Sequence, residues 1–201
     1  LRDFKTKQII GPIPNVSGVH GSAFVTPNTE YSMMASRFSI PIPKGTVAPI
    51  EKYATDYKGV LVGIKIDPKT GEMKLGWQIM TPPFDWDLGD AGKKVSDGWM
   101  FWTCYNSERA TGKLEVTASQ RDRDYIAAVD WKAVEKAVAE GQGDMIGGVK
   151  VIDPKKVPGL VYLMPCGKSP HGVDVSPDGK YIVGSGKLQG VTTVFNFEKI
   201  Q

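Results

Sequence analysis

The pattern of apolar and polar positions is typical of short β-strands for most of the chain, with Gly and Pro residues marking the turns between them. Residues 60–66 (VLVGIKI) and 72–80 (EMKLGWQIM) flank the turn at residues 67–71. Because proline presets a turn and Gly71 accommodates positive φ, this segment predicts a β-hairpin.

A second series of short strand-like segments separated by turns lies near the end of the sequence. Residues 172–175, 180–184 and 191–197 alternate with turn residues, among them the Ser-Pro-Asp-Gly turn at residues 176–179. Two meanders of this kind are typical of repeated β-propeller blades, which take about 40 to 45 residues in simple families. The chain therefore predicts a mainly β, partial propeller of roughly three meander blades over residues 1–201, with the remaining blades supplied by a longer chain.

One segment has helical periodicity. Trp131, Val134 and Val138 recur at spacings of three and four residues, Asp130 is a suitable N-cap, and Gly141 is a suitable end. We expect one short amphipathic helix inserted between strands, with its apolar stripe used for packing.

Two segments are expected to be long loops, residues 39–57 and residues 81–98. The second carries an acidic group around Trp86, formed by Asp85, Asp87, Asp90 and Asp97. We interpret this group as a solvated loop, with a cation site as the alternative.

Composition and charge exclude several classes of function. The content of hydrophobic residues is 41%, and Lys+Arg 25 against Asp+Glu 22 gives a net charge of +3, too small and too mixed to indicate nucleic acid or an anionic membrane. The sequence has no apolar run long enough for a membrane span, and no charged segment followed by an apolar core has the pattern of a signal peptide. It also shows no phosphate loop, hydrolase triad or zinc-type spacing. Cys104 and Cys166 define no disulfide framework, and we expect at least one of them to be a small buried hydrophobe.

The only two histidines, His20 and His171, each precede a glycine and lie a few residues before a turn and a tyrosine. Imidazole is the commonest side-chain ligand of transition metals, and a repeat architecture brings equivalent positions around a common axis. The pair therefore predicts a shared metal site. The alternative is that both histidines cap strands by hydrogen bonding.

An ordered set of phrases makes a family resemblance specific. Along the chain they are GVHG (18–21), WTCYNSE (102–108), IGGVKVID (146–153), SPHG (169–172), SPDG (176–179) and GKL (186–188). Together they resemble the central part of the N-terminal seven-bladed propeller of nitrous-oxide reductase, over nearly the whole chain.

The resemblance implies a periplasmic copper enzyme that reduces nitrous oxide to dinitrogen and water. His20 and His171 match two of the seven histidines that hold a sulfide-bridged four-copper cluster at the propeller hub. The other ligand motifs, and the C-terminal cupredoxin domain with its binuclear copper centre, have no counterpart in this chain. We therefore expect an inactive fragment of a larger parent. A c-type cytochrome or small copper protein as electron donor, and a homodimeric parent, are further implications.

The phrase Tyr105 to Glu108 resembles the family's calcium-binding loop. Tyr105, Glu108 and Asp124 would supply oxygen ligands. The chain departs from the family pattern, because a methionine is missing from residues 114–123 and Lys168 and Ser169 replace an asparagine. As an alternative, Glu108 and Asp124 pair with arginines on a solvated face.

A second hypothesis comes from a different class of function. Surface repeats of the Ser-Pro-Asp-Gly-Lys-Tyr kind also suit a non-catalytic β-propeller interaction or binding module. That hypothesis predicts distant imidazoles and no copper.

Overall fold

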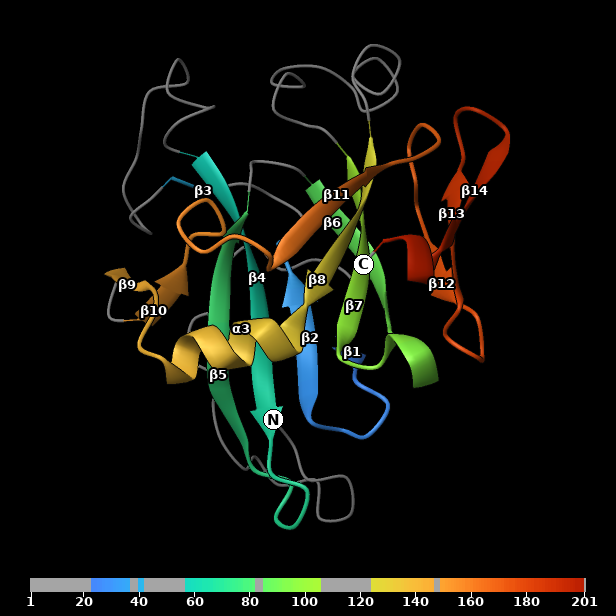
Figure 1. Cartoon of the computed structure of the whole chain (residues 1–201). Coiled ribbons are helices and arrows are strands. Elements are labelled where there is room, and N and C mark those ends of the chain that lie inside the picture. Colours follow the sequence, from blue (N-terminus) through green and yellow to red (C-terminus); the bar gives the residue numbers. More distant parts are fainter. Residues whose placement is uncertain are drawn as a thin grey trace, which may run out of the picture.

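In the part of the chain that the structure describes, the fold has three β-sheets and one α-helix (Figure 1). The computed structural model describes residues 23–36, 40–41, 57–81, 85–105, 124–146 and 149–200. His20, Glu108 and most of the expected loop at residues 39–57 lie outside these ranges. Within them, the expectation of a mainly β protein with one inserted helix is confirmed.

The first sheet has seven strands in the order β1-β2-β4-β5-β10-β9, with β3 pairing β4. All of its pairs are antiparallel except β10 with β5, which is parallel. The strands are β1 (Phe24–Val25), β2 (Tyr31–Ala35), β3 (Ile40–Pro41), β4 (Tyr57–Ile66), β5 (Met73–Thr81), β9 (Asp144–Ile146) and β10 (Val149–Ile152).

The predicted hairpin is the β4–β5 pair of this sheet. Its turn closes through a hydrogen bond of 2.8 Å from the Gly71 amide to the Asp67 carbonyl. The Asp67 carboxylate also accepts hydrogen bonds from the amides of Lys69 and Thr70, at 2.8 and 3.0 Å. Gly71 has a φ of +71°, as the turn requires.

The middle sheet is an antiparallel meander in the order β11-β8-β7-β6, and the third is the meander β12-β13-β14. The third sheet confirms the second predicted meander. The strands are β6 (Asp85–Ala91), β7 (Trp99–Tyr105), β8 (Tyr125–Asp130), β11 (Val161–Pro165), β12 (Val173–Val175), β13 (Tyr181–Gly186) and β14 (Val191–Asn196). Two short 3₁₀ helices complete the described elements, η2 (Lys94–Ser96) and η4 (Phe197–Lys199).

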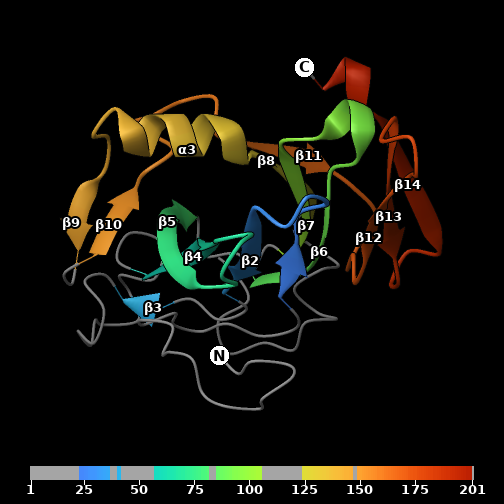
Figure 2. The ribbon, with the colours of Figure 1, turned by 90° about the horizontal axis from the view of Figure 1, so that it is seen from below.

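The middle sheet lies between the other two, as seen from below in Figure 2. One of its faces, with Trp102 and Val129, joins a hydrophobic core that includes Trp77 of β5. The opposite face, with Phe101 and Ile126, joins a second core with residues of β12 and β13. The two central strands of this sheet, β7 and β8, are therefore buried on both faces.

The predicted helix is α3 (Trp131–Ala139). The Asp130 carboxylate caps it by accepting a hydrogen bond of 2.8 Å from the Ala133 amide. Gly141, with a φ of +84°, lies just beyond its end. Trp131 and Val134 are buried in the first core, which confirms the packing role of the apolar stripe. No helix in the described ranges is long and apolar enough to cross a membrane.

The prediction of a long loop at residues 81–98 is wrong, because this segment holds β6 and η2. β6 pairs with β7 and buries Trp86 in the first core. The four aspartates masked the strand pattern, since acidic residues are depleted in strands.

Asp90 and Lys93 link the middle sheet to the third sheet. The Asp90 carboxylate accepts hydrogen bonds from the Val175 amide at 2.8 Å and from Lys93 Nζ at 2.6 Å. Lys93 Nζ also donates to the Val175 carbonyl at 2.9 Å. Next to this link, the turn at Gly179 packs directly against the backbone carbonyl of Lys93. These contacts fix the position of the third sheet relative to β6.

We predict that Gly179→Ala strongly destabilises the protein. Gly179 has a φ of +78°, and an added Cβ would overlap the Lys93 carbonyl, which is backbone and cannot rotate away. We expect a loss of about 2–4 kcal/mol in the free energy of unfolding, measured by urea titration.

The matched control is Gly190→Ala, because Gly190 has a φ of +64° but open space around it. Its cost should be only about 1 kcal/mol, from the backbone conformation alone. Equal costs for the two variants would show that the contact between Gly179 and Lys93 does not constrain the sheets.

Candidate functional site around His171

The site begins with an irregularity in β6. The pairing of β6 with β7 shifts register between Trp86 and Gly89, which marks a β-bulge. The Thr103 hydroxyl fills the gap by bonding both the amide and the carbonyl of Leu88, each at 3.1 Å. Trp86 and Asp87 are consecutive residues, yet they are only 1% and 3% exposed. The bulge therefore allows a carboxylate to be buried beside the core.

The Asp87 carboxylate contacts His171, which lies just before β12 of the neighbouring sheet. His171 Nδ1 lies 2.8 Å from Asp87 Oδ2. The backbone around the histidine is held as well, because the amides of His171 and Gly172 both donate to the Ser185 hydroxyl of β13, at 3.2 and 3.1 Å. His171 is therefore fixed at its backbone and at one ring nitrogen, although its side chain is 61% exposed.

This contact determines the tautomer of the neutral imidazole. An ionised carboxylate only accepts hydrogen bonds, so we assign the proton to Nδ1 of His171. The lone pair then resides on Nε2. A buried carboxylate on one ring nitrogen and a lone pair on the other is the usual arrangement of a metal-binding histidine.

Tyr105 adds a second contact to the same carboxylate oxygen. Its hydroxyl lies 3.3 Å from Asp87 Oδ2, and the residue is only 2% exposed. Lys187 Nζ lies over the Tyr105 ring at 5.3 Å from the centroid. Asp87 therefore contacts the buried hydroxyl of Tyr105 on its own sheet and the exposed imidazole of His171 next to the third sheet.

Asp124 lies close to this group, at the end of the middle sheet. The register pairs Cys104 with Tyr125, so Tyr105 and Asp124 lie beside each other where β7 ends and β8 begins. Asp124 is 2% exposed, and its Oδ2 accepts a hydrogen bond of 2.7 Å from the Ser169 amide. Two of the three predicted calcium ligands are therefore neighbours, and the third, Glu108, lies outside the described residues.

The predicted partner histidine, His20, also lies outside the described ranges. Within those ranges, no group of three or more His, Cys, Asp or Glu side chains is arranged to hold a metal ion. The described part of the chain thus contributes one oriented imidazole.

The contact between Asp87 and His171 was not predicted from the sequence. The expectation that the aspartates around Trp86 form a solvated loop is wrong for Asp87, which is buried, and for Asp90, which links two sheets. The sequence did contain a signal for it, because Asp87 lies between two apolar residues, Trp86 and Leu88. Such neighbours place the aspartate inside a strand.

Cys104 and Cys166 are both free thiols. They pack on opposite faces of the middle sheet, because Cys104 belongs to the first core and Cys166 contacts the second. Burial raises the pKa of Cys104 well above its usual value, and burial with the nearby Asp124 charge raises the pKa of Cys166 to about 12. The expectation that at least one cysteine is a small buried hydrophobe is confirmed for Cys104.

Comparison with known proteins shows a consistent resemblance. The chain is 30% identical to nitrous-oxide reductase of Stutzerimonas stutzeri over 94% of its own length. It is 26% identical to the Pseudomonas fluorescens enzyme over 94%, and 28% identical to that of Ralstonia nicotianae over 95%. The chain spans about 29% of the length of the first two relatives. No protein-family profile matches it. The resemblance to nitrous-oxide reductase indicated by the motifs is confirmed.

Two solved structures show the same fold at low sequence identity. A periplasmic gluconolactonase of Pseudomonas aeruginosa aligns over 100% of this chain and 46% of its own, with a TM-score of 0.54 and 14% identity. Hydrazine synthase of Kuenenia stuttgartiensis aligns over 90% of this chain and 46% of its own, with a TM-score of 0.53 and 14% identity. These likenesses concern the fold alone. With the adjacent meander sheets, they confirm the expected partial β-propeller.

We predict that replacing the two partners of the contact between Asp87 and His171 has unequal effects on stability. Asp87→Ala should lower the free energy of unfolding by about 1–3 kcal/mol, because it leaves the buried Tyr105 hydroxyl without this acceptor. His171→Ala removes an exposed side chain and should cost less than about 1 kcal/mol. Urea titration at neutral pH measures both values. A cost for His171→Ala as large as that for Asp87→Ala would show that the imidazole serves the fold.

We also predict that Cys166 reacts slowly with alkylating reagents. With a pKa of about 12, its thiolate is scarce at pH 8. Because the thiolate is the nucleophile, iodoacetamide should modify the folded protein roughly 1000-fold more slowly than an unperturbed cysteine. Mass spectrometry of the Cys104→Ala variant isolates the rate at Cys166. Alkylation of Cys166 at the rate of an unperturbed, exposed cysteine would contradict the burial of this thiol.

Proposed function

We propose that this chain forms part of the copper-binding propeller of a nitrous-oxide reductase, roughly three of seven blades over residues 1–201. In this proposal His171 and His20 are ligands of the catalytic four-copper sulfide cluster. The observation that carries it is the geometry of His171, an exposed imidazole whose Nδ1 is fixed by a buried carboxylate. The resemblance over nearly the whole chain is the independent support.

The residues present suit copper. Neutral imidazole nitrogen is a preferred ligand of copper, and the contact with Asp87 leaves Nε2 of His171 as the free donor. The buried Asp87 carboxylate fixes the ring, which is the role of a group behind a metal ligand. An exposed strand-capping histidine does not require a buried carboxylate.

The individual residues have separate roles in the proposed site. The cluster, when bound, supplies the electrons for reduction of nitrous oxide to dinitrogen and water, a reaction that consumes two electrons and two protons. Asp87 fixes the plane of the imidazole and keeps the proton on Nδ1. Tyr105 restrains Asp87, and Ser185 restrains the backbone of His171.

The resemblance carries the remaining parts of the proposal. They are a periplasmic location, a homodimeric parent, a binuclear copper centre in a cupredoxin domain, and a c-type cytochrome or small copper protein as electron donor. Calcium binding by Tyr105, Glu108 and Asp124 is also proposed. The adjacency of Tyr105 and Asp124 supports the calcium site, because oxygen ligands of calcium must converge.

The test is copper loading of the full-length protein with His171→Ala. We expect this variant to lose the copper of the cluster and to keep the copper of the binuclear centre, measured by mass spectrometry of metal content. Anomalous diffraction at the copper edge on the unsubstituted protein should show copper about 2 Å from His171 Nε2.

The matched control is Asp174→Ala, an exposed residue on β12 close to the histidine. It should retain all of the copper. Full copper loading of His171→Ala, with no copper near His171, would contradict the proposal and favour a non-catalytic propeller interaction module.

A further inference from the structure

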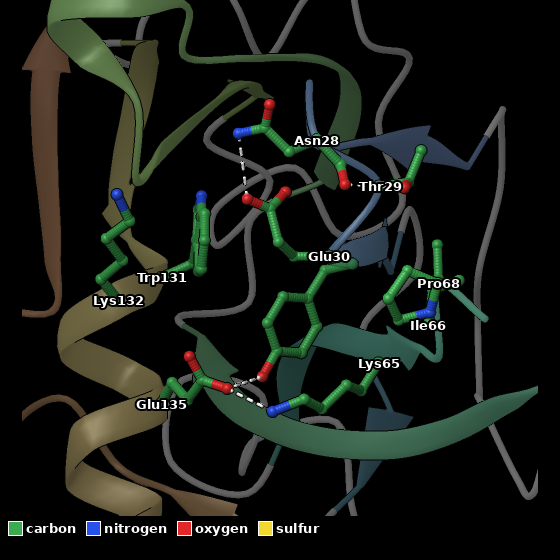
Figure 3. Close-up of a pocket in the computed structure, with 10 residues that line it drawn as sticks. Asn28, Thr29, Glu30, Lys65, Ile66, Pro68, Trp131, Lys132 and Glu135 are labelled. Carbon is green, nitrogen blue, oxygen red and sulfur yellow. Dashed lines mark hydrogen bonds and ion pairs between the residues drawn. The ribbon is translucent and has the colours of Figure 1, made fainter.

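A second candidate site lies on a different part of the molecule, between the β1–β2 turn, β4 and the start of α3. It is a pocket of about 380 Å³, shown in Figure 3. Its lining includes Glu30 and Tyr31 at the start of β2, Lys65 of β4, and Trp131 and Glu135 of α3. None of the residues around His171 contributes to it.

The Glu30 carboxylate in this pocket is held only by neutral groups. The Thr26 hydroxyl donates to Oε2 at 2.6 Å, and the Asn28 side-chain amide donates to Oε1 at 3.2 Å. Although burial disfavours the charged form, these hydrogen bonds and those from the backbone hold the pKa of Glu30 below its usual value. Glu30 is therefore an oriented anion, and no basic side chain in the described residues pairs with it.

The other charges of the pocket do not neutralise Glu30. Lys65 pairs with Glu135 at 2.6 Å, and Lys132 pairs with Asp97 at 2.7 Å. The contact with Lys65 holds the pKa of Glu135 low, while the nearby Glu30 charge acts in the opposite direction. The pocket lining thus carries two carboxylates and two ammonium groups, but Lys132 is paired with Asp97 outside the lining, which leaves Glu30 as the carboxylate without an ammonium partner among the described residues.

The wall of the pocket is aromatic and carries an unused hydrogen-bond donor. The rings of Tyr31 and Trp131 lie 5.5 Å apart between centroids, and Trp131 is 3% exposed. Among the described residues, Trp131 Nε1 is buried without a hydrogen-bond partner, as are the indole nitrogens of Trp77, Trp86 and Trp102, and of these four only Trp131 lines the pocket. Figure 3 shows the nitrogen end of this indole turned toward the side of the pocket that holds Asn28 and Glu30. A buried donor of this kind is normally satisfied, so an acceptor from a ligand fits here.

We propose that this pocket binds a small organic cation, a guanidinium group that carries an acceptor oxygen on its stem. The guanidinium would pair with Glu30, while the acceptor would bind the Trp131 N–H. Guanidinium is planar and presents a fork of donors, which suits a carboxylate better than ammonium does. The proposal does not depend on the copper function.

The test uses N-acetyl-L-arginine amide and its uncharged counterpart, N-acetyl-L-citrulline amide, in calorimetric titrations of the full-length protein. The two probes share their shape and their acetyl and amide carbonyl groups, and they differ in that an uncharged urea replaces the guanidinium. We expect the arginine probe to bind at least about tenfold more tightly, because the citrulline probe lacks the charge-assisted contact with Glu30. Equal affinities would overturn the proposal.

Two variants test the residues. Glu30→Gln should weaken binding of the arginine probe about tenfold, and the control Glu72→Gln, an exposed carboxylate at the β4–β5 turn, should leave it unchanged. With 5-fluorotryptophan in the protein, the probe should shift the fluorine resonance of Trp131, identified as the signal lost in Trp131→Phe. Binding that is unaffected by Glu30→Gln and leaves this resonance in place would show that the probe binds elsewhere.

Discussion

Burial of the central strands β7 and β8 on both faces is the constraint on which the rest of the structure depends. Adjacent residues of β7 enter different cores, as Trp102 packs toward the first sheet and Phe101 toward the third. A strand in this position must be almost entirely apolar. Any polar side chain that is buried on such a strand, or on the strand next to it, must have a hydrogen-bond partner inside the molecule.

The site around His171 follows from this constraint. The bulge in β6 buries Asp87 next to the core, where Tyr105 lies within reach of the carboxylate. The partner of Asp87, His171, lies just before β12 of the third sheet, so the geometry of the site depends on how the two sheets pack. The contacts among Asp90, Lys93 and Val175 maintain that packing. The same region therefore serves both the packing of the sheets and the proposed copper site.

Local signals were sufficient for several elements. The β4–β5 hairpin, the β12–β14 meander and α3 were predicted because turn residues, a capping aspartate and apolar periodicity act over a few residues. β6 was missed because its aspartates resemble a loop when read locally. Their partners lie on other strands, as in the contact between Asp87 and His171, which joins residues far apart in the chain.

The sequence by itself determined the fold class, the positions of most strands, His171 as a candidate ligand, and the resemblance to nitrous-oxide reductase. Only the tertiary structure decided which nitrogen of His171 is free, that Asp87 is its partner, and that Glu30 and Trp131 line the same pocket. The physical reason is that periodicity and turn chemistry are local properties of the chain. Hydrogen bonds between sheets depend on distances that exist only after the sheets have packed.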